Sequence, residues 1–404
     1  MANDAIIKET IAQSLKNAGY SRRDFLQLCT TIMATAPMGL AFTEKATPAE
    51  VAKAVGKAKK PSVVWLHFQD CTGCSETLLR TSKPDVADLI LNVISLDYHE
   101  TLMAACGQQA EDALKSAVSQ NTGKFVLVVE GAIPVKEQGI YMKLGGRPAL
   151  EVLKDVGSKA AAIIAIGSCA SWGGVPSADP NPTGATGVDS IITDVDSIRT
   201  GVDSIITEKP IVNIPGCPPN PYTLLGVVLE FAVMGKLPAL DALKRPKFAY
   251  DRLIHDHCPR RAHFDAGRFA GQFGDANHRE GYCLFKLGCK GPVTHAGCPT
   301  RHFNEVVDAW PIAIGAPCFG CTEQSVGFRM PAFERVADVH LATPPDTYAP
   351  IFSTVGKIGA TAAGLVGIAA GAMGGAAWAT SQKLVSSDDA VAVERRKPTI
   401  AGGK

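Results

Sequence analysis

The stretch Ser62-Val-Val-Trp-Leu-His-Phe-Gln-Asp-Cys-Thr-Gly-Cys-Ser-Glu76 decides the fold that we expect for this chain. Its apolar run, Val63 to Phe68, predicts a buried strand. The run ends in a turn that carries Cys71 and Cys74, and a helical pattern follows. Residues that come directly after the strands of an open parallel sheet lie in the crevice where such sheets bind their ligands. The stretch therefore predicts a parallel α/β sheet with two thiols at its ligand-binding edge.

Two other predicted strands end in the same way. Residues 161–166 run into Cys169, and residues 210–214 run into Cys217. Because the carboxyl ends of parallel strands share one edge of the sheet, we expect all four cysteines at that edge. Such a group of soft thiolates favours zinc or an iron–sulfur cluster.

The composition limits the classes of protein to which the chain can belong. It has 404 residues, of which 46% are hydrophobic, so it can bury a sizeable core and is expected to form two domains plus tails. Its formal net charge of +1 gives no argument for a nucleic-acid partner. Twelve cysteines in an exported protein would ordinarily suggest disulfides, but their spacing favours metal binding.

Strand and helix patterns alternate over residues 61–244, which predicts a doubly wound, flavodoxin-like parallel sheet. Cys106 falls inside a helical pattern and is interpreted as a small core residue. The expected strands lie near residues 62–68, 89–96, 124–130, 161–166 and 210–214, and the expected helices near residues 75–81, 101–120, 147–158 and 221–235.

A short tandem repeat interrupts this alternation. Residues 186–194 recur almost unchanged as residues 200–208. Surface loops tolerate insertions at small entropic cost, whereas solenoids need several units. We therefore interpret the repeat as a loop duplication that bulges outward without moving Cys169 or Cys217.

Residues 245–349 are rich in Gly, Pro, His and Cys and have few long apolar runs, so we expect an irregular domain that metal sites hold together. Together with the four cysteines of the sheet edge, its cysteines account for all but Cys29 and Cys106. A set of spacings this complete is a stronger signal than any single C-x-x-C. The candidate ligands of this domain are His255, Cys258, Cys283, Cys289, Cys298, Cys318 and Cys321.

The N-terminus carries an export pattern. Arg22 and Arg23 stand in S-R-R-D-F-L, ahead of a short uncharged segment, residues 28–42. The pattern resembles a twin-arginine signal, which exports proteins already folded with their cofactors; a basic helix start is the plainer alternative. We expect the signal over residues 1–45, with cleavage between about Ala41 and Ala49, and a solvated linker over residues 46–60.

The C-terminus carries a pattern typical of a membrane anchor. Residues 358–382 have no charge and are long enough to cross a bilayer as a helix. Gly367, Gly371 and Gly375 give successive G-x-x-x-G spacings, which suit close helix packing in lipid. We expect an anchor over residues 350–383 and a cytoplasmic tail over residues 384–404; a flexible Gly/Ala-rich tail is the alternative.

Several motifs together resemble the small subunit of [NiFe] hydrogenases, over about residues 61–345. In chain order they are C-T-G-C-S-E, G-S-C-A-S-W-G-G, P-G-C-P-P-N-P, H-x-x-C-P-R-R, G-C-K-G-P and P-C-F-G-C. The two terminal patterns are similar to those of the exported, membrane-bound members. The resemblance implies three iron–sulfur clusters in this chain and a nickel–iron centre in a separate large subunit.

The resemblance also implies three ligand sets. Pro311 stands where some relatives carry a fourth medial cysteine, so the medial cluster is expected to hold three irons. The sets are Cys71, Cys74, Cys169 and Cys217 for a proximal [4Fe–4S] cluster; His255, Cys258, Cys283 and Cys289 for a distal [4Fe–4S] cluster; and Cys298, Cys318 and Cys321 for a medial [3Fe–4S] cluster.

Three further residues are interpreted through the family. The H-x-x-C spacing favours His255 over His257, which we expect to be an outer hydrogen-bond donor or solvated. Gly73 and Gly174 stand where oxygen-tolerant members carry two extra cysteines, so the sequence predicts a conventional proximal cluster.

The activity implied is H2 ⇌ 2H⁺ + 2e⁻, with hydrogen split in the partner and electrons removed through this chain. No residue of this chain is expected to be catalytic, and Glu76 is a candidate interface carboxylate or an ordinary residue of a first helical turn. The expected membrane partner is a b-type cytochrome or similar acceptor. The main body is expected in the periplasm, at the inner membrane, with a cytoplasmic C-terminus.

Two other functions fit parts of the sequence. A quinone-reductase subunit related to respiratory complex I would share the sheet and the proximal site but would lack residues 255–321. A zinc-binding interaction module would explain single C-x-x-C pairs, but a closed zinc site with three ligands would be unusual.

Overall fold

The computed structural model describes residues 10–21, 23–25, 48–82, 84–192, 209–302, 306 and 308–334. The chain divides into two compact units, residues 1–343 and 344–404, and every described residue lies in the first. The expected anchor and tail, Cys29 and the second copy of the repeat fall outside the described residues. Within the part that is described, no helix combines the length and the apolar character that a membrane span needs.

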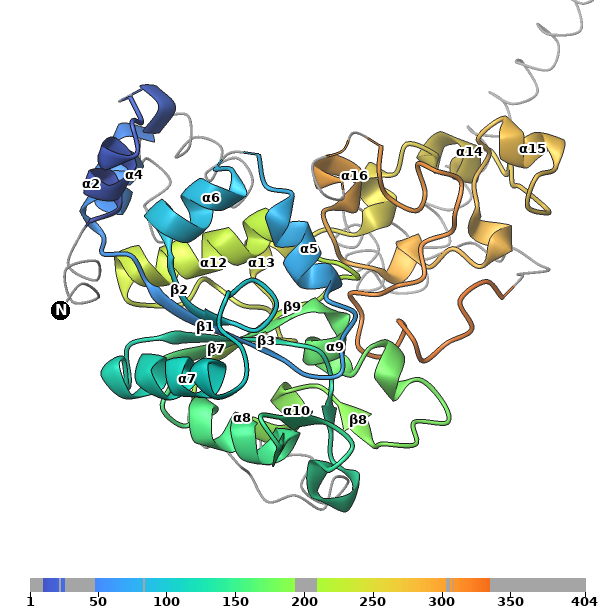
Figure 1. Ribbon diagram of the computed structural model, residues 1–404. Coiled ribbons are helices and arrows are strands. Elements are labelled where there is room, and N and C mark those ends of the chain that lie inside the picture. Colours follow the sequence, from blue (N-terminus) through green and yellow to red (C-terminus); the bar gives the residue numbers. More distant parts are fainter. Residues whose placement is uncertain are drawn as a thin grey trace, which may run out of the picture. The chain divides into compact units, whose positions relative to one another are not determined.

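A five-stranded parallel sheet lies at the centre of the first unit (Figure 1). Counted along the chain, the strands are arranged in the order 2-1-3-4-5, which is the flavodoxin-like order. The predicted doubly wound parallel sheet is therefore confirmed. Across the sheet the strands are β2 (Ser95–His99), β1 (Ser62–His67), β3 (Val126–Glu130), β7 (Ala162–Ile166) and β9 (Ile211–Ile214).

Four of these strands end level with one another. His67 pairs with Glu130, Glu130 with Ile166, and Ile166 with Ile214. The loops that follow the four strands therefore start side by side at one edge of the sheet. Every residue of β1, β3, β7 and β9 is buried, which is why each strand appears in the sequence as a mainly apolar run.

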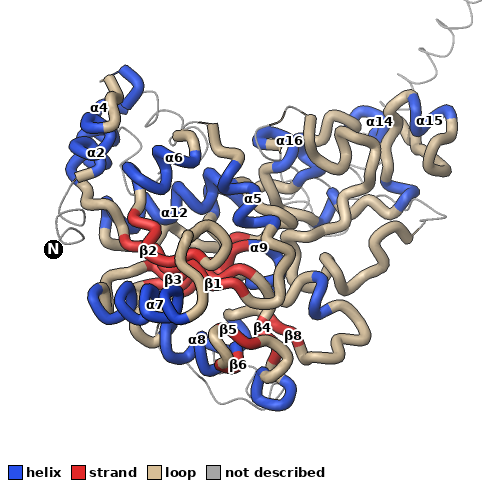
Figure 2. Tube along the Cα trace, in the orientation of Figure 1, coloured by secondary structure: helices blue, strands red, loops and turns tan. Residues whose placement is uncertain are grey.

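Helices cover both faces of the sheet (Figure 2). Successive residues of β1 point to opposite faces, so Trp65 belongs to the core on one side and Leu66 to the core on the other. The covering helices are α5 (Gly73–Leu79) and α12 (Pro221–Met234) on the first face and α7 (Gln108–Gln120) and α8 (Ala149–Gly157) on the second.

One predicted strand is partly wrong. Residues 89–96 begin with a helical turn of π type, η1 (Leu89–Val93), which follows α6 (Val86–Asp88). Both end residues of η1 are buried, because a spacing of four places them on one side of a helical turn, against the core. Strand β2 therefore starts only at Ser95.

The helix predicted over residues 101–120 starts only at Gln108. Gly107, at φ +55°, comes directly before it, and the chain upstream is a loop. Cys106 lies in that loop and is exposed, so its interpretation as a core residue is wrong.

The first copy of the repeat begins in one of two short strand pairs that lie outside the main sheet. Two short antiparallel pairs join β4 (Ile133–Pro134) to β8 (Ala185–Thr186) and β5 (Lys143–Leu144) to β6 (Arg147–Pro148). The first copy of the repeat starts in β8 and continues into α10 (Asp189–Ile192). Residues 193–208 lie outside the described part, so the outward bulge stays a prediction.

The expected solvated linker over residues 46–60 is wrong, because it contains helix α4 (Pro48–Lys57). Val55 of α4 is fully buried in the first core, so this segment is part of the folded domain. The apolar residues of α4 are spaced by about one helical turn, so they form an apolar stripe that must be buried against another element. This explains why the segment is folded and not a solvated linker. That other element is α2 (Ile11–Asn17).

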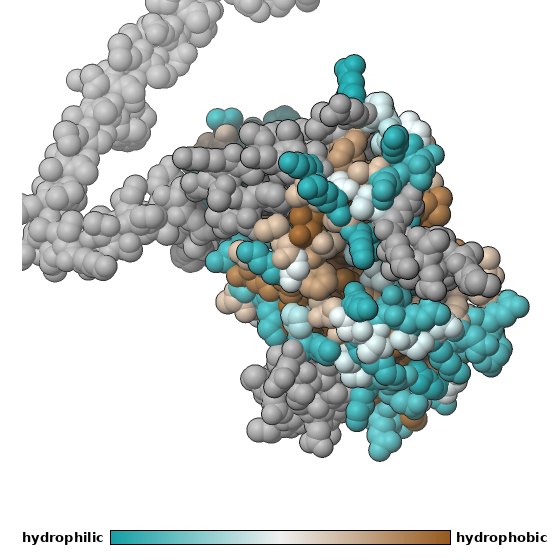
Figure 3. Space-filling model, turned by 90° about the vertical axis from the view of Figure 1, so that its left-hand side faces the viewer, coloured by the Kyte–Doolittle hydropathy of each residue, from teal (hydrophilic) through white to brown (hydrophobic). Residues whose placement is uncertain are grey.

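Helix α2 belongs to the expected signal, yet it is built into the same core. Ile11 and Leu15 are completely buried there, with 0% and 1% of their surface exposed. The Ser14 hydroxyl donates a hydrogen bond to Asn92 Oδ1 at 2.9 Å, which ties α2 to the segment before β2. Figure 3 views the molecule from this side, where hydrophilic and apolar side chains are mixed.

Beyond residue 244 the described chain consists of short helices joined by loops, with a small core of its own around Leu284, Leu287, Trp310 and Ile312. The thiol of Cys318 belongs to this core, and three further cysteines pack against it. The helices are α13 (Lys247–Tyr250), η5 (Ile254–His257), α14 (Arg261–Asp265), α15 (Ala276–Arg279), η6 (Phe285–Leu287), η7 (Gly291–Val293) and α16 (Cys298–Arg301).

Candidate functional site

The first group of thiols follows three strands of the sheet. Cys71 and Cys74 come from the turn after β1 and the start of α5, Cys169 from α9 (Gly167–Trp172) after β7, and Cys217 from the loop after β9. Burial raises the pKa of the Cys74 thiol well above its usual range, and the charges of Glu130 and of the other three thiols raise it further. The structure therefore brings together the four predicted proximal residues.

Glycines make room for these thiols. A Cβ atom on Gly167, at φ +83°, would lie 2.5 Å from Cys74 Sγ. A Cβ atom on Gly174, at φ +47°, would lie 2.6 Å from Cys169 Sγ and 2.8 Å from the Cys169 backbone. Both sites combine a backbone that favours glycine with space for hydrogen alone. These two loop glycines thus shape the pocket of the first group.

A buried carboxylate holds the C-x-x-C turn. Glu130, at the end of β3, accepts hydrogen bonds from Trp65 Nε1 at 3.1 Å, from the Ser75 hydroxyl at 2.6 Å and from Cys74 N at 3.0 Å. Ser75 N is a fourth donor at 3.4 Å. Such a carboxylate, fully supplied with donors, fixes the turn without needing a cation.

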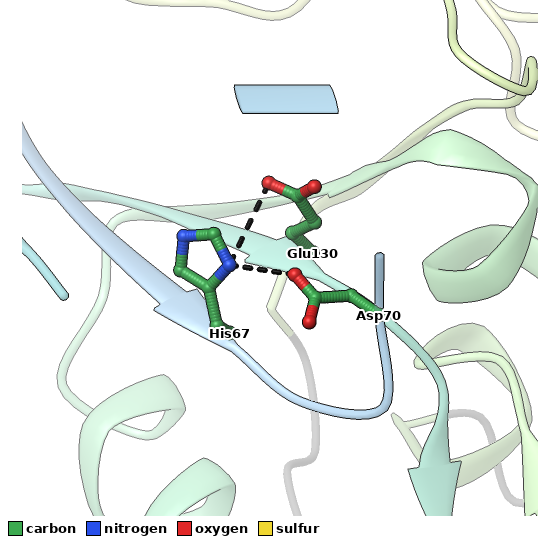
Figure 4. A group of neighbouring side chains, drawn as sticks. All are labelled: His67, Asp70 and Glu130. Atoms are coloured by element: carbon green, nitrogen blue, oxygen red, sulfur yellow. Dashed lines mark hydrogen bonds and ion pairs between the residues drawn. The ribbon is translucent and has the colours of Figure 1, made fainter. Parts of the chain in front are cut away.

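Glu130 also belongs to a cluster with His67 and Asp70 (Figure 4). His67 Nδ1 lies 2.6 Å from Asp70 Oδ2 and 3.8 Å from Glu130 Oε2. Burial opposes a charged imidazole, but the hydrogen bond to Asp70 and the charge of Glu130 outweigh it and raise the pKa of His67. The three side chains could approach a single cation, but their mutual contacts already satisfy them, so they act as a brace under the turn.

The second group of ligands lines one pocket in the irregular region. The pocket is bordered by the four predicted distal residues, His255, Cys258, Cys283 and Cys289. Burial, with a smaller effect of Arg261, lowers the pKa of His255 to about 4, so its imidazole is neutral at pH 7. Its Nε2 atom is buried and has no hydrogen-bond partner. A neutral imidazole with a free ring nitrogen is the form that binds metals.

The third group combines two buried cysteines, Cys318 and Cys321, with the half-buried Cys298. Burial raises the pKa of Cys298 to about 12, and it raises the pKa values of Cys318 and Cys321 still further. Each of the three thiols is close enough to another of them for their charges to interact. Pro311, between them in sequence, offers no ligand atom.

Direct contacts link the three groups. Cys318 N donates to Cys289 Sγ at 3.4 Å, which joins the third group to the second. The Ser168 hydroxyl, next to Cys169, donates to the Cys321 carbonyl at 2.7 Å, which joins the third group to the first. The groups thus form a continuous series, with Cys298, Cys318 and Cys321 in the middle.

The chemistry of these groups fits metal clusters. The eleven cysteines that the structure describes are all free thiols, so none of them forms a disulfide. Because burial raises most of their pKa values, the thiols stay protonated unless a cation compensates the thiolate charge. Iron–sulfur clusters supply that charge and accept sulfur ligands at this density.

Two predicted outer residues lie on the surface of this chain. Glu76 lies in the first turn of α5 with its side chain 54% exposed, and its Oε1 pairs with Arg80 Nε at 2.7 Å. His257 is exposed, and its Nε2 lies 3.4 Å from Arg252 Nη1. The solvated alternative is therefore correct for His257.

Comparison with known proteins identifies this arrangement. A family described as NADH ubiquinone oxidoreductase, 20 Kd subunit, matches residues 71–231, and the family of the C-terminal part of the NiFe/NiFeSe hydrogenase small subunit matches residues 250–334. The Hydrogenase-2 small chain of Escherichia coli K12 is 46% identical over 88% of this chain and 90% of its own length. This chain belongs to the [NiFe] hydrogenase small-subunit family.

Other relatives agree. The Periplasmic [NiFe] hydrogenase small subunit 1 of Nitratidesulfovibrio vulgaris is 46% identical over 78% of this chain and 93% of its own. In the crystal structure of a reduced, active Ni-Fe-Se hydrogenase from Desulfomicrobium baculatum, one chain is 32% identical with a TM-score of 0.61, covering 69% of this chain and 100% of its own. The match over residues 250–334 favours the hydrogenase over the complex I alternative.

The function of a hydrogenase small subunit follows. Such subunits carry iron–sulfur clusters and pass electrons for the large subunit, which holds the nickel–iron active site. This chain is therefore the electron-transfer subunit of a hydrogenase, and no catalytic residue is expected in it. The brace of His67, Asp70 and Glu130 was missed at the sequence level; polar residues at or just after the ends of otherwise apolar strands were the available signal.

Gly174→Ala should destabilise the first group of thiols. Alanine at this position would have to keep a backbone conformation with positive φ, which costs about 1–3 kcal/mol. Its methyl group would also clash with Cys169 Sγ. We expect a lower melting temperature and fewer irons per chain in the purified complex, by iron analysis. Gly271→Ala is the matched control, because its Cβ would meet only Asp275 Oδ2 at 3.4 Å. Equal iron contents in the two variants would contradict this prediction.

Proposed function

We propose that the small subunit relays electrons through three clusters in a fixed order. The proximal set would be Cys71, Cys74, Cys169 and Cys217, the medial set Cys298, Cys318 and Cys321, and the distal set His255, Cys258, Cys283 and Cys289. An iron–sulfur cluster supplies reversible one-electron transfer when it is bound. The support comes from two contacts: Ser168, next to Cys169, bonds to the backbone of Cys321, and the backbone of Cys318 bonds to Cys289 Sγ.

The donor sets favour particular cluster types. Four donors in the first and last sets suit [4Fe–4S] clusters, and three buried thiols in the middle suit a [3Fe–4S] cluster, since Pro311 cannot ligate. His255 would serve its cluster as a neutral ligand through Nε2. Replacing one thiolate charge with a neutral imidazole raises the reduction potential of the distal site.

Removing one medial ligand tests the assignment. Cys318→Ser should abolish the [3Fe–4S] electron paramagnetic resonance signal of the oxidised complex, while the two [4Fe–4S] signals persist on reduction. The unaltered complex should carry about eleven irons in this chain. Cys106→Ser is the control, because Cys106 is an exposed thiol that belongs to none of the proposed sets. An iron-free or zinc-loaded small subunit would overturn the proposal.

We also infer a conventional proximal cluster. Gly73 and Gly174 occupy the positions of the extra cysteines of oxygen-tolerant members, and the backbone of Gly174 has no space for a side chain. A redox titration of the complex should therefore show one one-electron step at the proximal site. Two such steps would contradict this inference.

Finally, we propose that the complex is exported folded and anchored at the inner membrane, with its body in the periplasm and its C-terminus in the cytoplasm. The supporting features are the twin-arginine motif at residues 22–23 and the uncharged stretch 358–382, which would dock a b-type cytochrome or similar acceptor. Both features lie wholly or partly outside the described residues.

Arg22→Lys combined with Arg23→Lys should keep the small subunit in the cytoplasm, because the transport machinery reads the arginine pair. Cell fractionation with immunoblotting measures this, and Lys53→Arg, outside the motif, is the control. Periplasmic accumulation of the double variant at the normal level would exclude the twin-arginine route.

A further inference from the structure

A half-buried arginine with one fully buried N–H donor lies beside the proposed medial site. Arg301 ends helix α16, one turn after Cys298. Its Nη2 atom donates to the Phe248 carbonyl at 3.1 Å, whereas Nη1 is buried and has no hydrogen-bond partner. Burial lowers the pKa of Arg301, but an arginine stays charged at any physiological pH. The site therefore contains a fixed positive charge with an unused N–H donor.

Arg301 and two medial cysteines line one cavity. The two cysteines are Cys298 and Cys321, and the wall also includes neighbours of Cys217 in its loop: Pro215, Gly216, Pro218, Pro219 and Asn220. Tyr250, which is also in the wall, is close enough to interact electrostatically with Arg301 and with both thiols. The positive charge thus belongs to a residue that borders the same cavity as two of the three medial cysteines.

A second arginine, Arg245, has its charge balanced by carboxylates and serves as a comparison. Arg245 is buried, but its Nε lies 2.7 Å from Asp241 and its Nη1 lies 2.9 Å from Glu323. For Arg301, no carboxylate in the described part of the chain lies within ion-pair distance; the charge of Asp251 acts on it only from farther away. A buried charge that lacks a counterion is costly, so an anionic group in the cavity would be strongly favoured.

We propose that Arg301 is a positioning residue that raises the reduction potential of the medial cluster. This inference rests on the proposed assignment of Cys298, Cys318 and Cys321 to that cluster. Reduction of the site adds one electron and therefore one negative charge, which a fixed cation in a poorly screened interior stabilises. The unpartnered Nη1 donor is available for hydrogen bonding to sulfur, which acts in the same direction.

The consequence concerns the relay. Without a nearby cation, three anionic thiolates would make the medial site hard to reduce and would slow electron passage between its neighbours. Arg301 offsets part of that charge from within the chain itself. The electron still enters from the proximal side and leaves to the distal side, so no proton or further reactant is needed.

The test is a redox titration of the purified hydrogenase, with its large and small subunits together, monitored by the [3Fe–4S] signal. Arg301→Gln and Arg301→Met both remove the charge, and both should shift the medial midpoint potential to lower values. Arg301→Lys keeps the charge and should restore most of the shift. Arg252→Gln is the matched control, because it removes a guanidinium that is exposed. Arg252 is also near the medial site in the fold, since its carbonyl accepts a hydrogen bond from Ala296 N, two residues before Cys298.

The outcomes separate the possible explanations. A midpoint potential that is unchanged in both neutral variants, with the signal intact, overturns the role of Arg301. Loss of the signal in all three variants, Lys included, also overturns it, because the bond to the Phe248 carbonyl would then be what matters. Absence of a [3Fe–4S] signal from the unaltered complex would instead refute the medial assignment on which the inference rests.

Discussion

The level ends of four parallel strands are the constraint on which the rest of this structure depends. One row of backbone pairing runs from His67 through Glu130 and Ile166 to Ile214. A slip of one residue in any strand would turn its side chains to the other face and displace the loop that follows. Because both faces of the strands are buried, such a slip is strongly disfavoured. The positions of Cys74, Cys169 and Cys217 are thus set by the hydrophobic core.

The sequence was most informative where a pattern had one physical meaning. Apolar runs bounded by turns predicted the strands of the sheet and the four cysteines at its edge, whereas the other two ligand sets were implied by the resemblance to the hydrogenase small subunit. It failed where the local pattern had two meanings. Leu89 and Val93 fit a strand or a helical turn equally well, and only contact with the core decides between them.

Other features were beyond the sequence because they depend on contacts between distant segments. The burial of Ile11 and Val55 follows from the packing of α2 on α4: the apolar stripe of α4 indicates that a partner is needed but does not say which segment supplies it. The four donors on Glu130 come from two other elements, β1 and α5, and the lack of a partner for Arg301 Nη1 depends on which groups surround it in space. Glu130 and Arg301 lie near the cysteines and set the hydrogen bonding and charge around them. The ligands alone therefore do not determine the properties of the site.

The docking of α2 has a practical consequence for anyone who edits the N-terminus. Ile11 and Leu15 contribute to the same core as Trp65 and the strands that position the thiols. Deleting the first 20 residues would therefore remove part of the interior of a folded domain, although it would leave Arg22 and Arg23 in place. A precursor altered in this way could be retained, degraded or poorly loaded with metal simply because it is less stable. Changes confined to exposed positions such as Lys16 avoid this ambiguity.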